Sequence, residues 1–181
     1  GDADLFVTSL NRAASEEVLH DFTTPLVENL GLKSASKLLK DLFGKLKNES
    51  SVGRGIKDRV AAKINSYAGG VKVASVDSKG NLVLNLEEVL PSKKKVLLDE
   101  GINEIMNQLI ALQREGGDKF SEAFDTPGTN KIVETIRSAF KDTKLGDKLG
   151  IREEGTVRDL VSVMADLSTG NLSPRFQAKA D

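Results

Sequence analysis

Cysteine is absent from this sequence, and histidine occurs once in its 181 residues, at position 20. Without cysteine the chain forms no disulfide, zinc–thiolate site or iron–sulfur cluster and has no thiolate nucleophile. Aromatic residues make up only 4% of the chain, so side chains that stack on nucleic-acid bases are scarce. We therefore expect no cofactor, no bound metal and no nucleic-acid partner.

Long hydrophobic runs are also missing, since no stretch of about 18 apolar residues occurs. The sequence therefore predicts no membrane-spanning helix. No signal peptide is recognisable, and the start at Gly1 rather than Met is compatible with removal of a leader or a tag. With 39% hydrophobic and 29% charged residues, the composition is that of a soluble globular protein. It leaves the compartment open.

The formal net charge is −1, which argues against a general polyanion binder. The charges are unevenly distributed along the chain, however. Residues 1–32 carry six acids and one base, whereas residues 33–63 carry nine bases and three acids. The asymmetry falls on consecutive predicted helices and marks the basic segment as a candidate binding surface.

The segment 92–115 has the clearest helical pattern in the chain. Its aliphatic residues recur at steps of four, three, four and three, which places them on one stripe of a helix: Leu98, Ile102, Ile105, Leu109 and Leu112. We expect this stripe to be buried and the polar residues to take the other side of the helix: Asn103, Glu104, Asn107 and Gln113.

Three consecutive lysines, Lys93, Lys94 and Lys95, stand where this helix begins. A lysine in the first turn faces the positive end of the helix dipole, which is unfavourable by roughly a few tenths of a kcal/mol. We therefore predict that the helix starts later, near Val96. Compensation of the lysines by an anion is the alternative.

The periodicity changes to two in residues 71–76 and 82–87, around the turn sequence Asp-Ser-Lys-Gly at 77–80. This pattern predicts a β-hairpin at about 71–87. Two strands alone are marginally stable in water. We therefore expect one face of the hairpin to pack on the helix 92–115.

Further amphipathic segments precede and follow this region, at about 2–20, 25–31, 34–47, 56–68, 130–140 and 156–167. The sequence thus predicts a mainly α protein, a single domain over residues 1–181. Its architecture is a bundle of six to eight helices around a long central helix, with one β-hairpin. If the chain divides into two parts, the seam falls at the hairpin, 69–91.

The helix at 34–47 presents leucines on one side and lysines on another, and basic residues continue beyond it. A basic amphipathic helix can dock on an acidic protein or an anionic lipid surface. The simpler interpretation is a bundle helix with a solvated lysine face. The candidate binding residues are Lys33, Lys37, Lys40, Lys47, Arg54, Lys57, Arg59 and Lys63.

Our first hypothesis is therefore a non-enzymatic binding or assembly protein that docks through residues 34–63, and an oligomer is compatible with it. Two alternatives stay open. One is a carrier that holds an apolar ligand between its amphipathic helices. The other is a carboxylate-based hydrolase that uses Glu17 and His20, which requires a cleft holding His20 and a second acid from a distant segment.

Overall fold

The computed structural model describes residues 19–150 and 155–168, and these form a mainly α fold with one antiparallel hairpin. Residues 19–30 are helical. The labelled elements are α2 (Leu32–Gly44), α3 (Ser51–Ser66), β1 (Ala74–Val76), β2 (Leu82–Leu84), α4 (Pro91–Glu115), α5 (Lys119–Ala123), α6 (Asn130–Ala139), α7 (Lys144–Leu149) and α8 (Val157–Ser168). The predicted fold class is confirmed.

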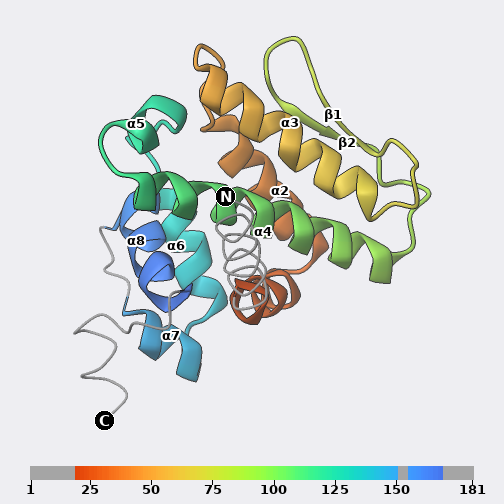
Figure 1. Cartoon of the computed structure of the whole chain (residues 1–181). Coiled ribbons are helices and arrows are strands. Elements are labelled where there is room, and N and C mark those ends of the chain that lie inside the picture. The colour runs from red at the N-terminus through yellow and green to blue at the C-terminus, as the bar shows by residue number, and fades with distance from the viewer. Residues whose placement is uncertain (1–18, 151–154, 169–181) are drawn as a thin grey trace, which may run out of the picture.

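Helix α4 is the central element, and α2, α3, α5 and α8 all pack against it. Figure 1 shows α3 and the hairpin toward one end of α4, with α6 and α8 toward the other. The predicted apolar stripe is confirmed, because its five aliphatic residues are at most 7% exposed. Buried apolar side chains from residue 19 to α8 form one core around this helix.

The polar side predicted for α4 does not exist in its middle, because every residue from 101 to 107 is buried. Asn103 and Glu104 are each 3% exposed, and Asn107 is 9% exposed. Asn103 Nδ2 donates to Thr23 Oγ1 at 3.2 Å, and Gln108 Nε2 donates to Glu104 Oε1 at 3.0 Å. The periodicity was right about the stripe and wrong about the opposite face, which neighbouring helices also cover.

The late start predicted for α4 is also wrong. The helix begins at Pro91, which occupies its first turn, and Leu90 is the N-cap residue. Lys94 N already donates to Leu90 O at 2.9 Å. Proline is well suited to the first helical position because its missing N–H has no partner there in any helix. All three lysines therefore lie in the opening turns of α4, and no acidic residue accompanies them in the first turn.

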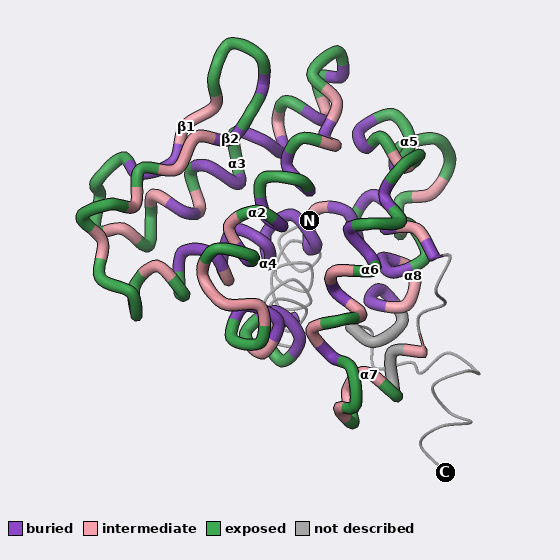
Figure 2. The backbone as a smooth tube through the Cα atoms, turned by 180° about the vertical axis from the view of Figure 1, so that it is seen from behind, coloured by how far each residue is buried: buried purple, intermediate pink, exposed green. Residues whose placement is uncertain are grey.

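The hairpin is shorter than predicted and packs elsewhere. Strands β1 and β2 pair with Ser75 opposite Val83, and Figure 2 shows the exposed loop that joins them. Asp77 Oδ1 closes this loop by accepting from Lys79 N and Asn81 N at 2.9 and 2.8 Å. The expected packing on α4 is wrong, since β1 packs on α3 and β2 lies beside α2.

The reason lies in one side chain of α3. Asn65 Oδ1 accepts from Val73 N and Ala74 N, both at 2.8 Å, and Asn65 Nδ2 donates to Ala74 O at 2.9 Å. The amide thus takes the hydrogen bonds that a neighbouring strand would otherwise make. It holds β1 on α3 and covers part of the strand edge.

Candidate binding cleft

The predicted basic residues divide between two helices with different surroundings. On α2, Lys33, Lys37 and Lys40 are exposed, and Lys37 Nζ lies 2.9 Å from Asp41 Oδ2. The apolar side of α2 is fully committed to the core through Ala35, Leu38, Leu39, Leu42 and Phe43. Only the lysine side of this helix is therefore available to a partner.

The remaining predicted residues lie in the α2–α3 loop and on α3. Lys47 is half-buried, Arg54 and Arg59 are exposed, and the Arg54 guanidinium donates to Asn48 O. Lys63 Nζ lies 5.6 Å from the centre of the Tyr67 ring, a cation–π distance. These side chains are placed by local contacts with their own loop and helix.

Lys57 does not belong to an exposed basic surface, because it is 3% exposed. Its Nζ donates to Asn48 Oδ1 at 2.5 Å and to Gly80 O at 2.6 Å. Burial lowers the pKa of Lys57 below its ordinary 10.5, while the charges of Asp77 and Glu49 act in the opposite direction. Lys57 is a structural link between α3 and the hairpin turn, and we remove it from the candidate set.

His20 packs between two carboxylates of α4. Its Nδ1 lies 3.1 Å from Asp99 Oδ1, and its Nε2 lies 3.3 Å from Glu100 Oε1. Thr23 and Thr24 also donate to the two oxygens of Asp99, each at 2.5 Å. Both ring nitrogens thus face acids, which leaves neither nitrogen directed at a nucleophile. The cluster holds the helix 19–30 against α4.

The hydrolase alternative required a second acid from a distant segment, and Asp99 and Glu100 are such acids. A cleft of about 410 Å³ beside them is lined by Asp99 and Thr24 but does not include His20. Glu17 lies outside the described residues. Within residues 19–150 and 155–168, no cluster of His, Asp and Glu side chains is arranged to hold a metal ion.

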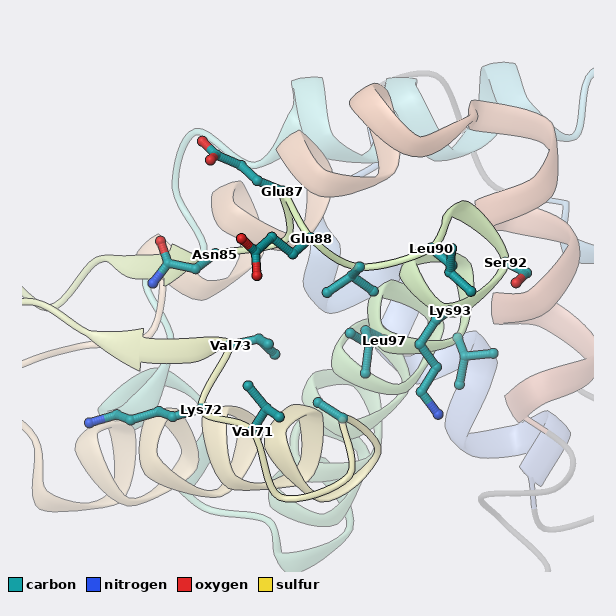
Figure 3. A pocket seen from close by; sticks show the side chains of 13 residues that line it. Val71, Lys72, Val73, Asn85, Glu87, Glu88, Leu90, Ser92, Lys93 and Leu97 are labelled. Atoms are coloured by element: carbon teal, nitrogen blue, oxygen red, sulfur yellow. The ribbon is translucent and has the colours of Figure 1, made fainter.

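A second cleft, of about 900 Å³, lies beside the N-terminal end of α4 and shares Ser92 and Val96 with the first. It is bounded by the segment 68–73 that follows α3, the segment 85–90 that follows β2, and the first turns of α4. Its apolar lining residues are Ala68, Val71, Val73, Val89, Leu90, Val96 and Leu97. Figure 3 shows Val71, Val73 and Leu97 gathered in its middle.

Exposed apolar surface concentrates at this cleft. Among the described residues the exposed large hydrophobic side chains are Val71 at 63%, Leu90 at 72%, Val96 at 39% and Tyr67 at 39%. The first three line the cleft, and Tyr67 directly precedes its lining residue Ala68. Contiguous exposed apolar surface on a protein marks a binding site more often than scattered single residues do.

This cleft is not predicted by the sequence, for a physical reason. Leu90 precedes a proline and lies in a connecting segment where no periodicity assigns it a face. The period-two pattern places Val71 in a strand of the predicted hairpin, whereas β1 begins only at Ala74 and Val71 lies in the connection before it. A signal was present, because large apolar residues in loops next to Gly and Pro have no core position to fill. Their assembly into one cleft depends on three segments that are separate in the sequence.

Comparison of the chain with protein-family models, with curated proteins and with solved structures finds no match. Among the described residues, no helix combines the length and the apolar character needed to cross a membrane. The case for a function therefore rests on the geometry of the cleft and of the basic surfaces.

Proposed function

We propose that this protein is a non-enzymatic binding protein that holds the apolar chain of a small lipid-like ligand in the cleft between the segment 68–73, the segment 85–90 and α4. The observation that carries the proposal is the gathering of exposed Val71, Leu90 and Val96 around one depression of about 900 Å³. Ligand pockets usually measure about 300–1,000 Å³ and are predominantly apolar.

Transfer of a hydrocarbon chain from water onto these side chains is favourable because it removes apolar surface from water on both partners, at about 25 cal/mol per Å². The site differs from a carrier whose helices open around a buried ligand. Here the protein's side chains fill the core around α4, and the hydrocarbon chain of the ligand would lie at the surface of the protein. Binding then needs no separation of the packed helices.

Charge at two cleft positions is expected to weaken this binding strongly. In the variant Val71→Glu/Val96→Glu, two carboxylates would have to be desolvated against the hydrocarbon chain. We expect the affinity for the neutral ligand myristyl alcohol to fall at least about tenfold, or about 1.4 kcal/mol. The measurement is displacement of the fluorescent apolar probe N-phenyl-naphthylamine by the alcohol.

The matched control is Ala111→Glu, which adds a carboxylate at an exposed position far along α4. This control should bind as the wild type does. Both glutamate variants should keep the wild-type melting temperature, since Val71 and Val96 are exposed. Equal affinity of the cleft variant and the wild type, or no binding of the alcohol by the wild type, contradicts the proposal.

A second candidate function is electrostatic docking of the α2 lysine side on an anionic lipid surface. The observation that favours it is a groove of about 450 Å³ between α2 and α6, which is lined by Lys37, Lys45 and Lys131. The single acid that lines this groove is Asp41. Each lysine near an anionic membrane contributes about 1 kcal/mol of attraction, and the buried apolar side of α2 rules out insertion of that face.

Charge reversal tests this second function. In the variant Lys33→Glu/Lys37→Glu/Lys40→Glu, we expect flotation with phosphatidylserine-containing vesicles to fall at least about tenfold. The control Lys119→Glu/Lys141→Glu/Lys144→Glu makes the same change of net charge at exposed lysines outside α2. An equal loss of vesicle binding in both triple variants would show that only the net charge of the protein matters, which contradicts docking through α2. Undiminished vesicle binding by the α2 variant would contradict it as well.

A further inference from the structure

We infer that the ligand of the cleft carries an anionic head group, and that Lys93 on the α4 side of the cleft holds this head. The inference rests on the proposed function, since it assigns the chemistry and orientation of the ligand in that same site. The cleft is apolar in its middle and charged at its ends, which is the pattern that an amphiphile with one chain and one head would match.

The two ends of the cleft differ in charge. Figure 3 shows Glu87, Glu88 and Asn85 on the hairpin side, and Ser92 and Lys93 on the α4 side. Lys72 also lines the cleft, so the end away from α4 carries two acids and one base. An anion is therefore repelled from that end and attracted to Lys93.

No acid of the described residues forms a salt bridge with the lysines on the α4 side of the cleft. In residues 19–150 and 155–168, Lys93, Lys94 and Lys95 form no salt bridge, and the first turn of α4 contains no acid. Asp99, one turn further along, is directed at His20, Thr23 and Thr24. Glu28 and Lys95 line the neighbouring cleft of about 410 Å³, and Glu28 is not among the residues that line the cleft of about 900 Å³.

The early start of α4 strengthens the attraction of this positive charge for an anion. The helix begins at Pro91, so the three lysines lie within its first turns. The lysine charges and the positive end of the helix dipole therefore coincide, and both stabilise an anion bound nearby. Lysine is a point charge with three donors, and Lys93 lines the cleft at this end. A singly charged carboxylate is the head group that matches one ammonium group.

The experiment compares three ligands with the same chain: myristate, myristyl alcohol and myristyltrimethylammonium, each displacing N-phenyl-naphthylamine from the full chain. We expect myristate to bind best and the ammonium ligand worst. The variant Lys93→Gln should weaken myristate binding roughly three- to fivefold and leave the alcohol unchanged. The control Lys119→Gln, at an exposed lysine of α5, should change neither.

The outcomes separate the two proposals. If the alcohol binds as tightly as myristate and Lys93→Gln alters neither affinity, the head-group inference is wrong while the cleft still binds an apolar chain. If the ammonium ligand binds best, the orientation is reversed and the inference is also wrong. If none of the three ligands displaces the probe, both the inference and the proposed function fail.

Discussion

Replacement of Gly53 by alanine is expected to lower the free energy of unfolding by about 2–4 kcal/mol, because the added methyl group has no space. A Cβ at this position would lie 2.2 Å from the backbone oxygen of Lys47 and 3.1 Å from that of Ala123. These neighbours are main-chain atoms, so no rotation of a side chain relieves the overlap. The measurement is urea unfolding followed by circular dichroism.

The contact at Gly53 matters because several segments meet there. Leu46 and Phe124 form an isolated antiparallel bridge, flanked by hydrogen bonds from Lys47 N to Ala123 O and from Asp125 N to Lys45 O, both at 2.8 Å. The first turn of α3 lies directly on this bridge, which only a residue without a side chain permits. A methyl group there must displace either α3 or the bridge.

Gly55, two residues further along the same helix, is the matched control. A Cβ on Gly55 would meet only the flexible guanidinium of Arg59, at 3.7 Å or more, and alanine favours a helix interior by up to about 1 kcal/mol over glycine. We therefore expect Gly55→Ala to be neutral or stabilising. A Gly53→Ala variant as stable as Gly55→Ala would show that α3 does not pack on the bridge as described.

Truncation of Leu109 to alanine is expected to lower the free energy of unfolding by about 2–5 kcal/mol, the range for buried leucine. Leu109 is 0% exposed and lies on the apolar stripe of α4. Its removal leaves a cavity between helices that are packed on several sides of α4. The measurement is the same urea titration.

Leu90→Ala deletes the same atoms at a position that is 72% exposed, and its expected effect is within about 0.5 kcal/mol. The difference between the two leucines isolates the contribution of burial from that of side-chain chemistry. Equal destabilisation by the two truncations would contradict the central position of α4. The Leu90 variant also serves the ligand measurements, because that side chain lines the cleft.

Much of the fold could be predicted from the sequence because its signals are local. The steps of three and four from Leu98 to Leu112 report a helix face directly. The turn after β1 follows from Asp77 and Gly80. The Asp77 carboxylate accepts hydrogen bonds within the loop, and Gly80 adopts the φ of 82° that closes it. Both features depend on residues within a few positions of each other.

The errors came from effects that depend on distant segments. The spacing places Glu104 on a polar side of α4 opposite the apolar stripe, yet elements from other parts of the chain pack around α4 and Glu104 is 3% exposed. Lys57 was predicted to join a basic surface, yet the hairpin turn closes over it and supplies the Gly80 carbonyl as its acceptor. Such burial is not encoded in the periodicity of the helix that carries the residue.

The sequence by itself determined the apolar stripe of α4, the hairpin turn, and the absence of cysteine chemistry, since each follows from residue type and short-range spacing. Only the tertiary structure decided that α4 is enclosed at residues 101–107 and that Val71, Leu90 and Val96 share one cleft. A helix pattern specifies which side chains point together, whereas the packing of remote elements determines which of them meet water. The candidate site arises where that packing leaves apolar side chains uncovered.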